Sequence, residues 1–342
     1  MMARGIAWIA SEAPRRFSRS AFERATSAAI IACALACRAT PVPAQPPVVA
    51  PRPVPAAPAP SPSRAAAGQF DGDAALRYVR AQLDFGPRVP GTLSARRTGD
   101  WLVAQLRERT DTVIVQEWTH RTQGGAQLPM RNIFARIKPE LTERVLYIAH
   151  WDTRPVSDAE FEAELRDRPT PGANDGASGV AMLLALADAL KHTPPSVGVD
   201  ILLVDGEDYG SFGPEVDVVI GSTHFAANLP LPGYRPIFGV VWDMVGDRDL
   251  RFLQEGHSLR GAPEIVNRVW SKAAALGYAK HFVATPGYQV MDDHVPLLAL
   301  GWRVIDVIDL DYQWHHTIAD TIDKVSAESL RIVGEVALAL VR

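Results

Sequence analysis

The chain has 342 residues, 47% of them hydrophobic, and a formal net charge of -4 at pH 7. This composition permits a sizeable core and excludes a fully disordered chain, and the charge gives no basic surface of the kind that nucleic-acid binding needs. The only two cysteines, Cys33 and Cys37, precede the part expected to fold. A metal in the folded part must therefore be held by His, Asp and Glu.

Residues 1–44 have the layout of an export signal. A segment with several arginines precedes the apolar run 27–37, which is shorter than the roughly 20 residues that span a bilayer. Val42-Pro43-Ala44 is a candidate cleavage site, and lipidation at Cys37 is the alternative. We expect an exported protein that is periplasmic, extracellular or lipid-anchored.

Residues 45–68 are rich in proline and alanine and predict an extended linker without a core. The catalytic domain is expected at residues 69–342. In this domain, helical spacing occurs at residues 76–83 and 101–106, and strand patterns occur at 112–118 and 130–137.

Four short apolar runs follow, at residues 145–149, 200–204, 238–242 and 304–308. Continuous apolar strands are typical of a sheet covered on both faces. Helical patterns at residues 180–190, 262–275 and 327–340 alternate with them. The order predicts a three-layer α/β/α sandwich with a mostly parallel central sheet.

Polar clusters follow three of these strands directly. His150 and Asp152 follow the first, Glu207 and Asp208 the second, and Asp243 the third. Because sites in open α/β sheets form beyond the carboxyl ends of the strands, we expect these side chains to meet at one edge. His150 could bind a metal while Asp152 orients it.

Asp175 lies between Gly172 and Gly176 at the start of a predicted helix. The glycines would let the backbone approach whatever Asp175 binds. The alternative is structural, because Asn174 or Asp175 could cap the helix.

Glu207 and Asp208 are adjacent acids after a buried strand, which is costly unless a cation or a shared proton offsets their charge. One could bind zinc while the other acts as a base. Further candidates are Asp292 and His294, and the pair His315 and His316. The residues alone do not choose between His315 and His316, nor do they count metals.

Taken together, these motifs resemble the zinc aminopeptidases and their sister group, the glutaminyl-peptide cyclotransferases, in particular the bacterial branch with the animal-type fold. The resemblance runs from Gly86-Pro-Arg-Val-Pro-Gly91 to the last helix. Its motifs are, in chain order, residues 150–155, 174–179, 207–210, 243–246 and 292–294. The resemblance implies the phosphorylase/hydrolase-like fold of the zinc aminopeptidases.

The resemblance also implies roles for single residues. Asp175, Asp208 and His316 match the ligands of a single Zn²⁺, and Glu207 matches the acid/base. His316 is preferred to His315 because Thr317 follows it and Asp320 lies four residues on. Asp243 and Asp292 match a pair of acids beside the substrate. In a two-zinc aminopeptidase, Asp175 would bridge the ions and His150 and Asp243 would complete the second site.

The implied activity is conversion of an N-terminal glutamine to pyroglutamate with release of ammonia. The alternative is an exported zinc aminopeptidase. The substrates would be peptide or protein N-termini, and we expect a monomer that contacts a membrane only through a lipid at Cys37. The sequence departs from the cyclases in the pocket wall. Many cyclases have an aromatic wall after the acid pair, but residues 211–220 here have no tryptophan, and position 315 is His where cyclases usually have Trp. Trp314 is the candidate replacement.

Overall fold

The structure is a computed structural model that describes residues 69–342. The predicted export signal, Cys37 and the linker at residues 45–68 lie outside the described residues. Among the residues described, no helix has both the length and the apolar character needed to cross a bilayer.

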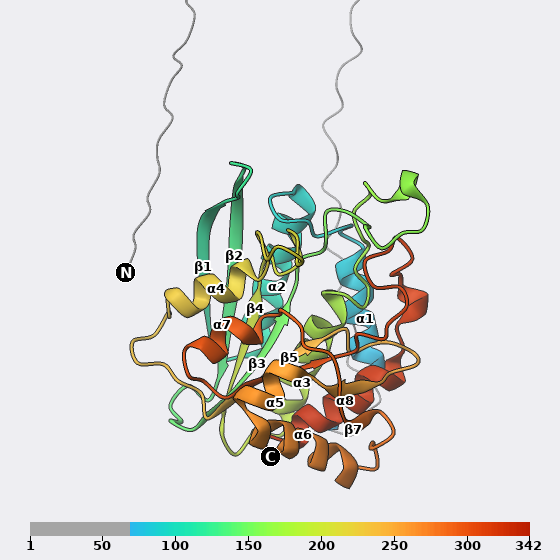
Figure 1. The fold of residues 1–342 in the computed structure, drawn as a ribbon. Helices are drawn as coiled ribbons and strands as arrows, with labels where there is room; N and C mark the ends of the chain where they lie inside the picture. Colours follow the sequence, from blue (N-terminus) through green and yellow to red (C-terminus); the bar gives the residue numbers. More distant parts are fainter. Residues whose placement is uncertain (1–68) are drawn as a thin grey trace, which may run out of the picture. The chain divides into compact units, whose positions relative to one another are not determined.

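A six-stranded sheet forms the centre of this part of the chain (Figure 1). The strand order is β1-β2-β4-β3-β5-β8, in which β3, β4, β5 and β8 run parallel and β1 and β2 are antiparallel additions at one edge. The predicted mostly parallel sheet is therefore confirmed. The strands are β1 (Thr112–Arg121), β2 (Gln127–Ile137), β3 (Arg144–His150), β4 (Gly198–Val204), β5 (Phe238–Asp243) and β8 (Val304–Ile308).

Both faces of the sheet are buried, as the apolar strands predicted. In β3, Val145 and Tyr147 belong to one hydrophobic core, whereas Leu146 and Ile148 belong to a second core on the opposite face. Successive side chains of a strand point to opposite faces, so one continuous apolar run serves two cores.

The helices complete the two outer layers. The first core contains residues of α1 (Gly72–Leu83), α2 (Leu93–Arg109), α3 (Ala177–His192), α6 (Pro263–Ala275) and α8 (Ala327–Ala339). The second contains Phe225 of α4 (Ile220–Ala227) and Leu297 of α7 (His294–Ala299). The three-layer prediction is thus confirmed, and Figure 1 shows α4 and α7 on the side of the sheet opposite α1 and α3.

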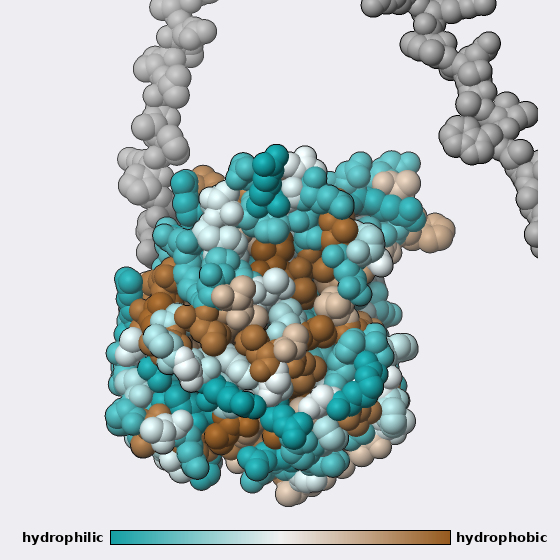
Figure 2. Space-filling view, turned by 60° about the vertical axis from the view of Figure 1, so that its left-hand side comes forward, coloured by the Kyte–Doolittle hydropathy of each residue, from teal (hydrophilic) through white to brown (hydrophobic). Residues whose placement is uncertain are grey.

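Several short elements were not predicted. They are α5 (Gly256–Gly261), β6 (Phe252–Gln254), β7 (Phe282–Pro286), and the 3-10 turns Ala163–Leu165 and Ile322–Lys324, in addition to α4 and α7. The helices among them have at most about two turns, too few to show a repeated apolar face, and β6 and β7 lack the continuous apolar pattern of the central strands. When the side carrying β1 and α4 is turned forward, hydrophobic side chains gather across the middle of the visible face, with hydrophilic ones around them (Figure 2).

Candidate metal and catalytic site

The predicted site residues meet beyond the carboxyl ends of the parallel strands. His150 ends β3, Asp243 ends β5, and Glu207 and Asp208 lie in the turn after β4. Asp175 precedes α3, and the loop after β8 brings in His316. Residues that lie more than a hundred positions apart in the sequence therefore come within a few ångströms of each other.

Two of the predicted ligands, Asp175 and Asp208, lie beside the third, His316. His316 Nε2 lies 3.2 Å from Asp208 Oδ1 and 3.7 Å from Asp175 Oδ2. Asp175 Oδ2 and Asp208 Oδ2 are buried and have no hydrogen-bond partner among the described residues. His315 Nε2 approaches Asp175 to 3.9 Å. His316 therefore contacts both acids, which fits it better than His315 as the third ligand.

This donor set suits zinc. Zn²⁺ binds nitrogen and carboxylate ligands in a tetrahedron, with bonds of about 2.0–2.2 Å. Two ligand atoms of such a tetrahedron lie about 3.3 Å apart. The separations of 3.2 and 3.7 Å lie on either side of that value. The acids hold the pKa of His316 above its usual value although burial opposes this, so a metal would have to displace that proton.

Backbone strain occurs at the same place. His316 has φ 56°, in the left-handed region that bulky residues rarely adopt. Strained residues of this kind are concentrated at functional sites, where the surrounding structure holds them.

Glu207 has the environment expected of an acid/base. The residue is 6% exposed, and burial raises its pKa well above the usual range. The positive His150 opposes this rise, whereas the charges of Asp292 and Asp208 add to it. A carboxyl group with a raised pKa can both take and return a proton near neutral pH.

His150 joins a second group of possible ligands. Its Nε2 lies 3.1 Å from Asp243 Oδ1 and 3.2 Å from Asp175 Oδ1, and a donor atom from each of these three residues lies within 4.8 Å of the others. Burial raises the pKa of Asp243 to about 6, partly offset by His150. The geometry thus contains the triad that a second metal would need.

The glycines beside Asp175 are required by close contacts. Gly176 has φ 89°, and a Cβ there would lie 2.3 Å from the carbonyl oxygen of Asp152. At Gly172, with φ 70°, a Cβ would lie 2.2 Å from a methyl group of Thr153. The capping alternative is wrong, because Gly176 is the N-cap of α3 and no side chain caps this helix.

Four positioning contacts had no clear signal in the sequence. The carboxylate of Asp152 accepts hydrogen bonds from the backbone N–H groups of Glu207 and Asp208, at 3.1 and 3.2 Å. Asp320 accepts those of Asn174 and Asp175, at 2.8 and 3.1 Å. Asp152 therefore holds the turn that carries Glu207, besides lying 3.5 Å from His150.

Two buried arginines complete this support. Arg88 donates to the carbonyl oxygens of Trp151, Pro171 and Gly172 and so ties the β3 end to the Asp175 loop. Arg154 donates to Asp208 Oδ1 at 2.9 Å and pairs with Asp158. A guanidinium group is suited to such multiple contacts because its N–H donors are fixed in one plane.

The site opens into a pocket of about 580 Å³. Asp175, Glu207, Asp243, Asp292 and His316 line it, together with Phe212, Ile308 and Leu310. Phe212 stacks on His316 at a ring distance of 6.2 Å and supplies the aromatic wall. Trp314 is not among the lining residues and instead packs against the Met244–Tyr312 cluster.

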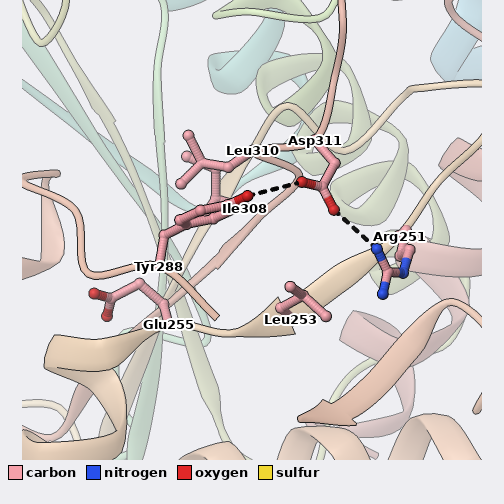
Figure 3. Close-up of a pocket in the computed structure, with 7 residues that line it drawn as sticks. All are labelled: Arg251, Leu253, Glu255, Tyr288, Ile308, Leu310 and Asp311. Carbon is pink, nitrogen blue, oxygen red and sulfur yellow. Dashed lines mark hydrogen bonds and ion pairs between the residues drawn. The ribbon is translucent and has the colours of Figure 1, made fainter. Parts of the chain in front are cut away.

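A small hollow lies beside this pocket and shares Ile308 and Leu310 with it (Figure 3). Its volume of about 10 Å³ holds at most one water molecule. Asp311 lies between the hydroxyl group of Tyr288 and the guanidinium group of Arg251, which are 3.4 and 3.0 Å away. Glu255 also lines the hollow.

Comparison with known proteins places this site in a family. The sequence profile described as peptidase family M28 matches residues 132–341. Among solved structures, the glutaminyl cyclase of Porphyromonas gingivalis is 39% identical and covers 79% of this chain and 97% of its own, with a TM-score of 0.76. A leucine aminopeptidase precursor from Bacteroides thetaiotaomicron is 36% identical, covers 81% and 98%, and has a TM-score of 0.78.

The glutaminyl-peptide cyclotransferase of Drosophila melanogaster is 23% identical over 72% of this chain and 75% of that protein. The chain spans about half the length of the first two curated relatives that it matches, 45% of one and 53% of the other. The family match begins within β2, covers every later strand of the sheet and includes all the candidate ligands. The chain belongs to peptidase family M28.

Proposed function

We propose that this chain is a zinc-dependent glutaminyl-peptide cyclotransferase, which converts an N-terminal glutamine of a peptide or protein to pyroglutamate and releases ammonia. The observation that carries the proposal is the contact of His316 with both Asp175 and Asp208, beside a pocket that Asp175, His316 and the buried Glu207 line. The glutaminyl cyclases among the relatives of this chain support it.

The chemistry follows from these positions. Zinc bound there would supply a Lewis acid for the γ-carboxamide oxygen of the substrate. Glu207 takes a proton from the attacking α-amine and delivers it to the departing ammonia. Asp292, with Asp243, lines the same pocket and accepts hydrogen bonds from the nitrogen that carries the proton.

One zinc per chain is the count we propose. His150 contacts both Asp243 and Asp175 directly, so the imidazole fixes these acids and offsets their charge. In this arrangement His150 and Asp152 are supporting residues, and Asp175, Asp208 and His316 are the ligands. We further propose, from residues 1–44, that the chain is exported, and that it acts as a monomer.

One observation favours a second candidate. The triad of His150, Asp175 and Asp243 could hold another ion, as a two-zinc aminopeptidase requires. Glu207 would then deprotonate the water that attacks the first peptide bond.

The two functions differ in their products and metal content. We expect glutaminyl-β-naphthylamide to be cyclised, leucyl-p-nitroanilide to be left intact, and one zinc per chain by elemental analysis. Two zincs with release of free amino acids would overturn the proposal in favour of the aminopeptidase.

A further inference from the structure

Residues 211–216 form a closed loop between the turn of the site acids and α4. Ser211 and Val216 exchange backbone hydrogen bonds at 2.9 and 3.0 Å, so the two ends of the loop lie side by side. Gly210 permits this closure, because a Cβ there would overlap the carbonyl oxygen of Val216. The loop is therefore a compact unit with one close approach at its neck.

This loop carries the ring of Phe212 into the catalytic pocket. The centre of the ring lies 6.2 Å from that of His316 and 5.7 Å from the guanidinium carbon of Arg154. Arg154 in turn donates to Asp208 Oδ1 at 2.9 Å. A shift of the loop would thus take an aromatic surface away from two of the candidate zinc ligands.

The backbone that follows Phe212 is strained. Glu215 and Asp217 have φ 54° and Val219 has φ 45°, which lie in the left-handed region that residues other than glycine rarely adopt, least of all a branched valine. Such residues keep their conformation only where surrounding contacts hold them. Val219 is held by its N–H group, which donates to the carbonyl oxygen of Glu207 at 2.9 Å. The loop before it needs a second point of attachment.

Asp217 supplies this attachment by binding the hairpin of β1 and β2. Its Oδ1 lies 2.8 Å from His120 Nε2, and its Oδ2 accepts the backbone N–H of Gln123 at 2.9 Å. A carboxylate only accepts, so the imidazole donates. The Asp217 side chain is 14% exposed, which limits competition from water, and hydrogen bonds to a carboxylate are about twice as strong as neutral ones.

The end of the hairpin that receives Asp217 has its own hydrogen bonds. His120 lies opposite Leu128 in the register of β1 and β2. Beyond this pair, Thr122 closes the turn, since its N–H donates to the carbonyl oxygen of Ala126 at 3.0 Å and its Oγ1 accepts the N–H of Ala126 at 2.9 Å. Because β2 also pairs with β4, the hairpin is continuous with the central sheet (Figure 1). It is therefore a firm anchor for the loop.

We propose that Asp217 is a positioning residue for the catalytic pocket. Through His120 and Gln123 it fixes the loop at residues 211–216 to the hairpin, and so holds the Phe212 ring in place as a wall of the pocket. The effect on catalysis rests on the proposed function, because it assumes that the substrate binds against this wall.

His120→Phe tests the attachment without any assay of activity. The variant keeps a ring on β1 but removes the donor to Asp217, and it leaves the sequence of the strained loop unchanged. Hydrogen exchange of the Ser211 and Val216 amides reports whether the loop opens. We expect these amides to exchange about tenfold faster in the variant, the scale of one hydrogen bond to a charged group.

His224→Phe is the matched control. His224 lies on α4, and its ring stacks on that of Trp118 with the centroids 3.9 Å apart. Exchange in the loop should be as in the wild type. Asp217→Asn is the second test variant, because asparagine also tolerates the left-handed conformation, and it should raise exchange as well. Wild-type exchange in folded His120→Phe and Asp217→Asn would overturn the inference.

The consequence for the pocket should be a change in KM without a change in kcat. In His120→Phe, KM for a glutaminyl substrate should rise about three- to tenfold, the range of one aromatic contact, with zinc content unchanged. Phe212→Leu should raise KM similarly, and the double variant should exceed neither, because both changes remove the same contact. Additive effects, or an unchanged KM in His120→Phe, would overturn the inference. Faster exchange in His120→Phe beside a wild type that does not cyclise glutaminyl peptides would support the attachment and overturn the proposed function instead.

Discussion

The two ends of the central sheet both bury carboxylates, but they treat them differently. Near the start of β4, Asp200 is fully buried and accepts hydrogen bonds from Arg144 at 2.6 Å, Arg136 at 3.2 Å and the hydroxyl group of Tyr234 at 2.8 Å. At the other end, Asp175, Asp208 and Asp292 each keep a buried oxygen without a partner among the described residues.

This difference separates what stabilises the fold from what the fold presents to a ligand. Two arginines and a tyrosine satisfy Asp200, so this acid gains nothing from an added cation. Beyond the carboxyl ends of the strands, burial and neighbouring acids make the charges of Glu207 and Asp208 costly. His150, His316 and Arg154 offset part of the negative charge of the site, and a bound cation would offset more of it, which is the condition of a metal site.

Removing the charge of Asp200, the fully hydrogen-bonded acid near the start of β4, should have the largest effect on stability. In Asp200→Asn, the buried guanidinium group of Arg144 loses its counter-charge, and such unpaired buried charges cost about 3–5 kcal/mol. Urea denaturation should show this loss in the free energy of unfolding, with zinc per folded chain unchanged. Full stability in this variant would show that the comparison between the two ends is mistaken.

A substitution among the site acids should have the reverse outcome, a loss of zinc and activity with little loss of stability. In Asp208→Asn, a ligand is lost, so zinc content and kcat/KM should fall, the latter by more than about 100-fold, beyond the effect typical of groups that only orient ligands. The free energy of unfolding of the metal-free protein should change little, because a costly buried charge is also removed. Asp100→Asn, which removes an exposed acid paired with Arg131, is the matched control. Retained zinc in Asp208→Asn would exclude Asp208 as a ligand.

Glu255 is a hydrogen-bonded acid close to the catalytic site, so the pH dependence of its contribution to stability tests the comparison further. Its pKa falls from 4.5 to about 2 on folding, so its ionised form stabilises the protein above about pH 4.5 and this contribution is lost as the pH falls toward 2. Glu255→Gln should therefore lower the free energy of unfolding at pH 7 by about 2 kcal/mol, the scale of hydrogen bonds to a charged group. The variant and wild type should converge near pH 2. An equal difference at both pH values would exclude this linkage.

Much of the fold could be predicted because its strands are buried on both faces. The apolar runs at residues 145–149, 238–242 and 304–308 became β3, β5 and β8 with bounds within one residue. The short helices α4, α5 and α7 could not be predicted, because six to eight residues hold too few turns to show an apolar face.

The chemistry of the site was predictable only where polar residues follow apolar strands. Glu207, Asp208 and Asp243 have that signal. Asp320 and Arg88 support the Asp175 loop through backbone groups, and hydrogen bonds to a backbone leave no pattern in side-chain sequence.

The central claim is that Glu207 moves the proton beside a zinc held by Asp175, Asp208 and His316. The most direct measurement is the rate of ammonia release from a peptide with N-terminal glutamine by Glu207→Gln, with zinc determined on the same sample. The account predicts a loss of more than about 100-fold, the scale of general acid/base catalysis, with one zinc retained per chain. Full activity in the zinc-loaded variant would contradict it.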